Sequence, residues 1–405
     1  MESPAPADPG ALPLTGIRVL DLATVLGAPV AATLLGEFGA DVVKIEEPTA
    51  GDVLRQFGPR DGGRPLLWLQ EARNKKSITL DLRLPRGQEI FRRLAASADV
   101  VAENFRPGTL DRCGLSYESL ARENPGLVML RVSGYGQTGP YRAKGSFDRI
   151  ASAFAGLTYT SGFADGPPVR QSFALADYLA AAFGAYGVML ALWHRDRNGG
   201  GGQEIDLALY EGIFRSSEGM LTAYQRLGIV RERMGNQNPG VCPAGNYRAQ
   251  DGAWVVINAG TDALWARLAV LIGSAALAGD ARYGASSERV ARADEVEGLV
   301  AAWVKTLPAA DVLRRLEAAG IPAERLYTVA DIAADPHYRA RNIVEVDDPR
   351  VGPVAMVGVI PRLSRTPGVI RWAGPDKGEH NAQVYGDRLG LRPDDLAALR
   401  DDGVI

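Results

Sequence analysis

Residues 17–46 constrain the fold of this chain more than any other segment. Residues 17–22 (IRVLDL) and 41–46 (DVVKIE) each have the pattern of a buried strand. Between them, small and apolar residues over 27–38 predict a helix that Gly39 ends. A strand, a helix and a strand in such a short span form a βαβ unit, whose two strands are parallel. An α/β domain around a parallel sheet is therefore expected.

Strand and helix patterns continue to alternate after this unit. Residues 77–82, 99–103 and 127–132 read as strands, and residues 87–96 read as a helix. Together with the first unit they predict a doubly wound α/β domain in the first third of the chain.

A dinucleotide site is the first alternative to weigh for such a unit. The turn after the first strand is ATVLGAP, residues 23–29. It lacks the G-x-G-x-x-G pattern, whose glycines let a pyrophosphate approach the helix N-terminus. The sequence therefore argues against NAD binding.

Charge and composition exclude several other classes. The net charge is −3, which gives no basic field for nucleic acid. No apolar stretch of membrane-spanning length is free of charged or turn residues. The two cysteines, Cys113 and Cys242, make no disulfide framework, and no Cys/His cluster has the spacing of a metal site. We expect a cytoplasmic protein with no metal, no nucleic-acid partner and no membrane partner.

Asp177 is the residue that most needs an explanation. It stands just before a strongly apolar, helix-like run over residues 179–193. One interpretation is a helix N-cap, in which the carboxylate accepts hydrogen bonds from the first amides. The other is a carboxylate nucleophile that forms covalent acyl intermediates. The two are compatible, since a helix N-terminus can both hold and tune an anion.

Eight short motifs, taken in order, resemble the class III coenzyme A transferases, also called the CaiB-BaiF family, which includes formyl-CoA transferase. Each motif is weak alone, but the ordered set covers nearly the whole chain. The motifs are GIRVLDL (16–22), FGADVVKIE (38–46), RNKKSI (73–78), ENFRPG (103–108), SGYGQTGP (133–140), ADY (176–178), GGQEID (201–206) and GEH (378–380).

The resemblance implies an architecture that periodicity cannot show. A large Rossmann-like domain would be built from both chain ends, with a smaller α+β domain inserted, in an interlocked homodimer. The implied divisions are a disordered tail (1–15), the first part of the large domain (16–200), a linker helix (201–227), the small domain (228–330), and a linker that returns to the large domain (331–405).

The resemblance also implies the chemistry. The aspartate at the position of Asp177 is the covalent nucleophile of this family, and it passes through an acyl anhydride and an aspartyl-CoA thioester. The expected partners are an acyl-CoA and a small carboxylic acid. Coenzyme A is thus a substrate, and no tightly bound cofactor is expected.

Coenzyme contacts carry over by motif. Thr24, Val25, Leu26 and Gly27 match the segment around the thiol arm and adenosine, although formyl-CoA transferase has His at the position of Thr24 and Gln at that of Leu26. The other expected coenzyme-binding residues are Asn74, Lys75, Arg112 and Lys144. The family's mobile glycine loop is not reproduced; residues 234–240 (MGNQNPG) stand in its place, and Gly240 fits either a flexible element or a plain turn.

The residues around Asp177 and Tyr210 look most like the branch that moves CoA from succinyl-CoA to C4–C6 dicarboxylates of the malate, citramalate, mesaconate or glutarate type. Arg55, Arg170 and Lys144 are candidates to hold the distal carboxylate. Intramolecular C1–C4 transfer in mesaconyl-CoA is one alternative. A second is an α-methylacyl-CoA racemase, but the histidine that would act opposite the aspartate is missing from residues 145–148 (GSFD). A third is a non-catalytic acyl-CoA-binding subunit.

Overall fold

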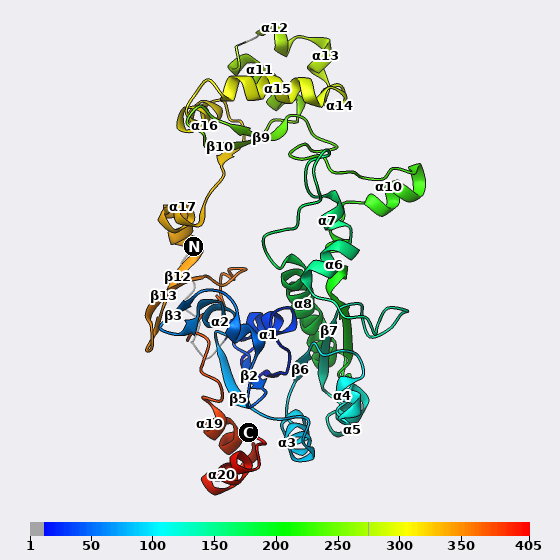
Figure 1. Cartoon of the computed structure of the whole chain (residues 1–405), viewed down its shortest axis with the longest axis vertical. Coiled ribbons are helices and arrows are strands. Elements are labelled where there is room, and N and C mark those ends of the chain that lie inside the picture. The colour runs from blue at the N-terminus through cyan, green and yellow to red at the C-terminus, as the bar shows by residue number, and fades with distance from the viewer. Residues whose placement is uncertain (1–11, 274) are drawn as a thin grey trace. The chain divides into compact units, whose positions relative to one another are not determined.

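The computed structural model describes residues 12–273 and 275–405, so most of the expected N-terminal tail (1–15) lies outside the described residues. The chain forms two compact units (Figure 1). Unit 1 contains the chain up to Leu157, Gln171–Leu221 and Arg339–Ile405; unit 2 contains Thr158–Arg170 and Thr222–Tyr338. Residues from both ends of the chain therefore share unit 1.

A six-stranded parallel sheet organises unit 1 and confirms the α/β prediction. The strand order is β5-β2-β1-β6-β7-β8. The strands are β1 (Arg18–Asp21), β2 (Asp41–Glu46), β5 (Lys75–Thr79), β6 (Val100–Glu103), β7 (Val128–Ser133) and β8 (Glu204–Ala208).

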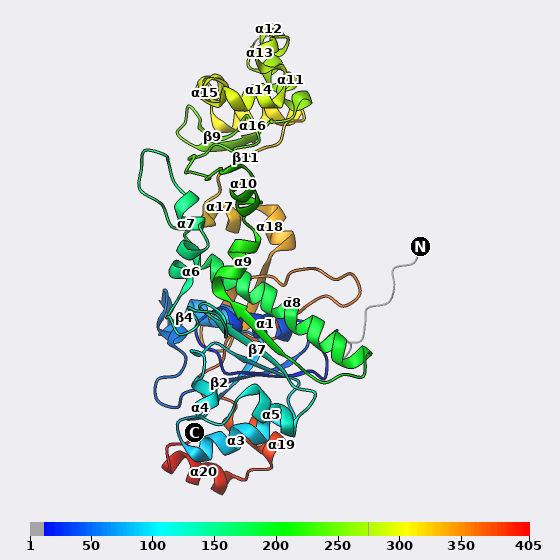
Figure 2. The same ribbon diagram turned by 90° about the vertical axis from the view of Figure 1, so that its right-hand side faces the viewer.

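Successive residues of each central strand enter two different cores. Val19 and Val100 pack on one face, while Leu20 and Val101 pack on the other, as the alternation of side chains along a strand requires. Both faces are buried, which explains why these strands read as continuous apolar runs. One core holds α1 (Ala28–Glu37), α8 (Leu175–Arg197) and α9 (Leu209–Arg215), and the other holds α3 (Pro85–Ala95), α5 (Tyr117–Glu123), α19 (Asn381–Leu389) and α20 (Pro393–Asp401) (Figure 2).

Shorter elements complete unit 1. They are η1 (Val53–Gln56), β3 (Arg60–Asp61), β4 (Arg64–Pro65), α2 (Leu66–Glu71), α4 (Thr109–Arg112), α6 (Asp148–Phe154), β12 (Ile343–Asp348) and β13 (Gly352–Val357). Three helices run across the division between the units: α7 (Leu157–Thr160), α10 (Met220–Leu227) and α18 (Pro336–Arg341).

The sequence pattern predicts one long helix over residues 210–226, and the structure shows that this prediction is wrong. The chain forms α9 and α10, and the turn between them contains Glu218 with φ 49° and Gly219 with φ 76°. Left-handed residues cannot continue an α-helix, so the apolar periodicity of the segment concealed a break.

Unit 2 is built on a three-stranded antiparallel sheet of β9 (Ala244–Arg248), β10 (Trp254–Asn258) and β11 (Ala323–Arg325). The sequence predicts a hairpin with its turn at Asp251-Gly252, and β9 and β10 form it. Helices α11 (Asp262–Leu271), α15 (Ala293–Val304) and α16 (Ala309–Ala318) bury the apolar core against it. The remaining helices of the unit are α12 (Ala275–Ala278), α13 (Ala281–Gly284), α14 (Ser286–Ala291) and α17 (Val329–Ala334).

Helix α8 is long and apolar enough, by length and composition alone, to cross a membrane. Core helices of soluble proteins pass the same test. Here α8 packs against α1, β7, β8 and α9, and its last turn carries His194, Arg195 and Arg197. Its role in the fold is to cover one face of the sheet.

Candidate active site

The strand order of the sheet changes direction between β1 and β6. Ligands of open α/β sheets bind outside the carboxyl ends of the strands at such a point. Residues 22–27 follow β1 there, and Asn104 follows β6. The Asn104 side chain holds the backbone of Thr24 from both sides: Oδ1 accepts from the amide at 2.8 Å, and Nδ2 donates to the carbonyl oxygen at 2.7 Å.

The loop leads from Thr24 to Asp177. The amide of Val25 donates to Oδ1 of Asp52 at 3.0 Å. Gly27 has φ 56°, and a β-carbon added to it would lie 3.3 Å from Oδ1 of Asp177. Gly27 thus lets the backbone approach the carboxylate closely. The amides of Leu26 and Gly27 donate no hydrogen bond to any residue within 12–273 or 275–405.

The structure corrects the N-cap interpretation of Asp177. Ala174 is the N-cap of α8, and Asp177 lies inside the first turn. The capping carboxylate is instead Asp148, whose Oδ1 accepts a hydrogen bond from the amide of Ala176 at 2.9 Å. The local signal for Asp148 is its place at the start of a helix pattern over residues 147–154. Only the fold shows that its carboxylate caps a different helix, α8.

Asp177 has the electrostatics of an activated carboxylate. Burial, with a smaller contribution from the negative charge of Asp148, raises the pKa of Asp177 from 3.8 to about 7. In the described part of the chain, neither a hydrogen bond nor an ion pair stabilises its ionised form. The carboxylate is therefore unusually basic, which favours attack on an acyl group.

This pKa predicts the pH dependence of the protein's chemistry. The nucleophile must be ionised, so activity should fall as pH drops below about 7. Asp148→Asn keeps an acceptor for the amide of Ala176 but removes the like charge. The acid limb of the kcat/KM profile should therefore move to lower pH, while staying above the ordinary range because burial remains. An unchanged limb would show that Asp148 does not tune Asp177.

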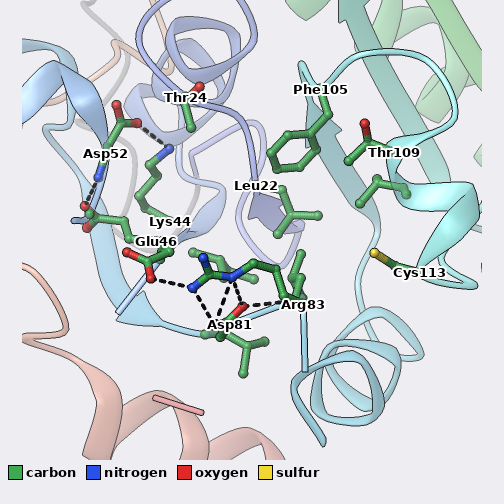
Figure 3. Close-up of a pocket in the computed structure, with 16 residues that line it drawn as sticks. Leu22, Thr24, Lys44, Glu46, Asp52, Asp81, Arg83, Phe105, Thr109 and Cys113 are labelled. Atoms are coloured by element: carbon green, nitrogen blue, oxygen red, sulfur yellow. Dashed lines mark hydrogen bonds and ion pairs between the residues drawn. The ribbon is translucent and has the colours of Figure 1, made fainter. Parts of the chain in front are cut away.

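A largely apolar cavity of about 250 Å³ opens beside the loop (Figure 3). Apolar, polar and charged side chains line the cavity. The apolar residues are Leu22, Ile45, Leu80, Leu82, Phe105 and Leu110, the charged ones are Lys44, Glu46, Glu47, Asp52, Asp81 and Arg83, and the others are Thr24, Gly51, Thr109 and Cys113. Its position at the carboxyl ends of β1, β2 and β6 is that of a ligand pocket. Thr24 lines this cavity, and Gly27, three residues later in the same loop, lies next to Asp177.

Two of the expected coenzyme residues face the interior instead. The Lys75 ammonium is 1% exposed, 2.8 Å from Oδ2 of Asp21 and 2.6 Å from the carbonyl oxygen of Pro29. The Asn74 side chain is bonded to the backbone of Val369 and Arg371. Both side chains therefore make their contacts in the interior of unit 1, where they connect segments of the fold.

None of the other expected cations contacts Asp177 within the part of the chain that the structure describes. Arg112 is exposed on α4 and donates to Thr109 at 3.2 Å, while Lys144 is exposed with its ammonium 3.6 Å from the ring centre of Tyr141. Arg55 pairs with Glu46 at 2.7 Å. Arg170 is exposed and belongs to unit 2. Within the described residues, no cation contributes to the pKa of Asp177.

Two relatives cover nearly the whole chain. The chain is 48% identical over 399 residues to the succinyl-CoA–L-malate CoA-transferase beta subunit of Chloroflexus aurantiacus, spanning 97% of this chain and 98% of the relative. It is 45% identical over 395 residues to the succinyl-CoA–D-citramalate CoA-transferase of the same organism, with the same coverage. Among solved structures, a CAIB/BAIF family protein from Brucella suis superposes with a TM-score of 0.82 at 33% identity, over 93% of this chain and 99% of that one.

The sequence profile described as CoA-transferase family III matches residues 14–381, which include the loop after β1, the cavity residues and Asp177. The chain therefore belongs to CoA-transferase family III and is an enzyme of that class.

Proposed function

We propose that this enzyme moves CoA from succinyl-CoA to a small dicarboxylate of the malate or citramalate type. The observation that carries the proposal is Asp177, a partly buried and unpaired carboxylate with a pKa raised to about 7, beside a loop with free amides. The activities named for the two Chloroflexus relatives support the choice of donor and acceptor.

The proposed reaction begins with attack of the Asp177 carboxylate on the thioester carbonyl of succinyl-CoA. The bond to sulfur breaks, giving a succinyl–aspartyl anhydride and CoA thiolate. The thiolate then attacks the Asp177 carbonyl and releases succinate, leaving an aspartyl-CoA thioester. The acceptor carboxylate attacks this thioester to form a second anhydride and free thiolate. Attack of the thiolate on the acceptor carbonyl yields the new acyl-CoA and regenerates Asp177.

Each addition places negative charge on a carbonyl oxygen next to Asp177. The backbone of Gly27 passes close to that carboxylate, and the unpaired amides of Leu26 and Gly27 are the proposed donors to the oxyanion. We place the coenzyme along residues 24–27, with part of it in the cavity lined by Thr24 and Phe105. Arg83 at the cavity and Arg112 on the adjoining helix α4 are the cations we propose for its phosphates. Lys75 and Asn74 take a structural role in this proposal.

Intramolecular transfer in mesaconyl-CoA would use the same intermediates, but it is not favoured, because the activities named for the relatives move CoA from succinyl-CoA to a separate acid. The racemase alternative is not favoured: the activities named for the relatives are transfers, and the closest histidine in the sequence, His194, lies at the other end of α8, where it bonds Asn198.

We further propose that two copies of the chain form an interlocked homodimer. Support comes from a continuous apolar surface on unit 1 between α1 and α8, where a cavity of about 600 Å³ is lined by Leu34, Phe38, Tyr186 and Met189, among others. The side chain of Trp193, farther along α8, is 62% exposed. Surfaces of this kind mark association sites. Sedimentation at successive dilutions tests the proposal, because interlocked chains cannot separate without unfolding.

The function itself is tested by trapping the covalent intermediate. The protein is incubated with succinyl-CoA and quenched with hydroxylamine or borohydride, and the modified peptide is mapped by mass spectrometry. Modification at Asp177, followed by CoA transfer to malate or citramalate but not to acetate, is the expected result. An unmodified Asp177 together with deuterium exchange at the α-carbon of a branched acyl-CoA would assign the racemase reaction instead.

A further inference from the structure

The loop that faces Asp177 is held in a strained conformation. Val25 has φ 67°, a region that β-branched residues rarely adopt. Such a conformation persists only where surrounding contacts enforce it, and it clusters at functional sites. Val25 lies directly before Leu26 and Gly27, so the backbone angles of Val25 set the direction in which their unpaired amides point.

Asp52 supplies the contact that enforces this conformation. Its Oδ1 accepts hydrogen bonds from the amide of Val25 at 3.0 Å and from the amide of Leu54 at 2.8 Å. The amide of Asp52 donates to Oε2 of Glu46, the last residue of β2, at 2.9 Å. This bond fixes the position of Asp52 relative to β2. Asp52 is 1% exposed, so water does not compete for these bonds.

Lys44 fixes the other oxygen of Asp52. Its ammonium lies 2.8 Å from Oδ2 of Asp52 and 3.8 Å from Oδ1 of Asp21, and it donates to the carbonyl oxygen of Ala23. Burial disfavours the charge on Lys44, but Asp21 and Asp52 outweigh it and leave the pKa of Lys44 raised. The ammonium therefore stays charged, and it connects the carbonyl oxygen of Ala23, at the start of the loop, to the carboxylate of Asp52.

We propose that Asp52 is a positioning residue of the transfer reaction, acting through Val25 to fix the amides of Leu26 and Gly27 at Asp177. The inference rests on the proposed function, because it assigns the strained loop to the stabilisation of the oxyanions formed there. Asp52 itself touches neither Asp177 nor the reacting atoms.

Asp348 offers a matched control for Asp52. It is 2% exposed, it accepts from the amide two residues on at 2.9 Å, and it pairs with a cation, Arg350. It differs in having no contact with the loop after β1. Asp52→Ser and Asp348→Ser keep a short acceptor for the local amide and remove the charged group.

We expect Asp52→Ser to lower kcat for transfer from succinyl-CoA to malate by about 10²-fold, with a smaller change in KM, since a displacement of about 1 Å costs this much. Asp348→Ser should lose thermal stability with kcat unchanged, although Arg350 keeps its ion pairs with Asp376 and Glu379. Asp52→Asn, which keeps the acceptor for Val25, should retain most of the kcat that the serine variant loses.

A double-mutant cycle with Val25→Gly separates positioning from general stability. Glycine adopts positive φ without strain, so the loop needs Asp52 less. The effect of Asp52→Ser on kcat should therefore shrink to less than about tenfold in the Val25→Gly background. Equal effects in both backgrounds, or an Asp52→Ser enzyme with normal kcat, would overturn the inference. A wild-type protein that transfers no CoA to any dicarboxylate would refute the proposed function instead.

Discussion

Asp177→Asn is expected to reduce CoA transfer by at least about 10³-fold. At pH values above 7, the same substitution is expected to raise the thermal unfolding temperature of unit 1. The loss of activity follows because the amide cannot attack a thioester. The gain in stability follows from the cost of holding an ionised carboxylate in a partly buried site. A gain in stability that accompanies a loss of function is the trade-off expected at an active site that is itself destabilising.

The sign of the stability change depends on the direction of the pKa shift. The folded protein binds the Asp177 proton more tightly than the unfolded chain does, since its pKa is raised from 3.8 to about 7. Stability is therefore lost as pH rises through this interval, and the full cost is present above about 7. The side chain keeps some exposure to solvent, so we expect a gain of about 2 kcal/mol for Asp177→Asn at pH 8, and less at pH 4.

Asp395 provides the control with the opposite sign. It also lies in the first turn of a helix of unit 1, α20, but a hydrogen bond from the backbone amide of Arg392 holds its pKa below the ordinary value. Asp395→Asn should therefore lower the unfolding temperature at pH 8 and leave transfer unchanged. If Asp177→Asn behaves like Asp395→Asn in calorimetry, the raised pKa of Asp177 is refuted.

Lys75→Met is expected to destabilise unit 1 by about 3–5 kcal/mol, because it leaves Asp21 buried without its direct partner. Burial lowers the pKa of Lys75, and the attraction of Asp21 offsets this effect only in part. The charge on Lys75 is therefore already costly in the native protein. The ammonium also donates to the carbonyl oxygen of Pro29 at the start of α1, and that acceptor would lose its bond. Chemical denaturation at pH 7 measures the change.

Lys76→Met is the matched control for Lys75→Met. Its ammonium is only partly buried and lies 3.0 Å from Asp41, so the expected loss is less than about 1 kcal/mol. A stable Lys75→Met protein with a raised KM for acyl-CoA would mean that Lys75 contacts the coenzyme, as the resemblance implies, and that the interior position of its side chain changes on binding.

The parallel sheet could be predicted from the sequence because apolar runs bounded by turn residues are a local signal. Residues 41–46, for example, form β2 with the expected bounds. The covalent role of Asp177 could be expected only from the ordered motifs, since a lone aspartate before a helix is more often a cap. The structure adds why it is not the cap: another carboxylate, Asp148, takes that position.

Other features of the site had no local signal. Lys75 looks like a surface cation in the string RNKKSI, yet the alternation along β5 turns it inward to Asp21, 54 residues earlier. The strain at Val25 depends on Asp52, which follows β2 in the chain, and on Asn104, which follows β6 and holds the adjacent Thr24. Such contacts join segments that only the sheet brings together, so no window of the sequence contains them.

The return of the C-terminal residues to unit 1 has a consequence for synthesis. Tyr385 and Ile405 belong to the core on one face of the sheet, and Val404 accepts a hydrogen bond from the amide of Asp81. On the ribosome this face stays incomplete until residues 381–405 emerge, whereas residues 222–338 of unit 2 are contiguous and emerge earlier. The nascent chain thus carries exposed apolar strands through most of translation, which makes it a natural client for chaperones that bind apolar segments.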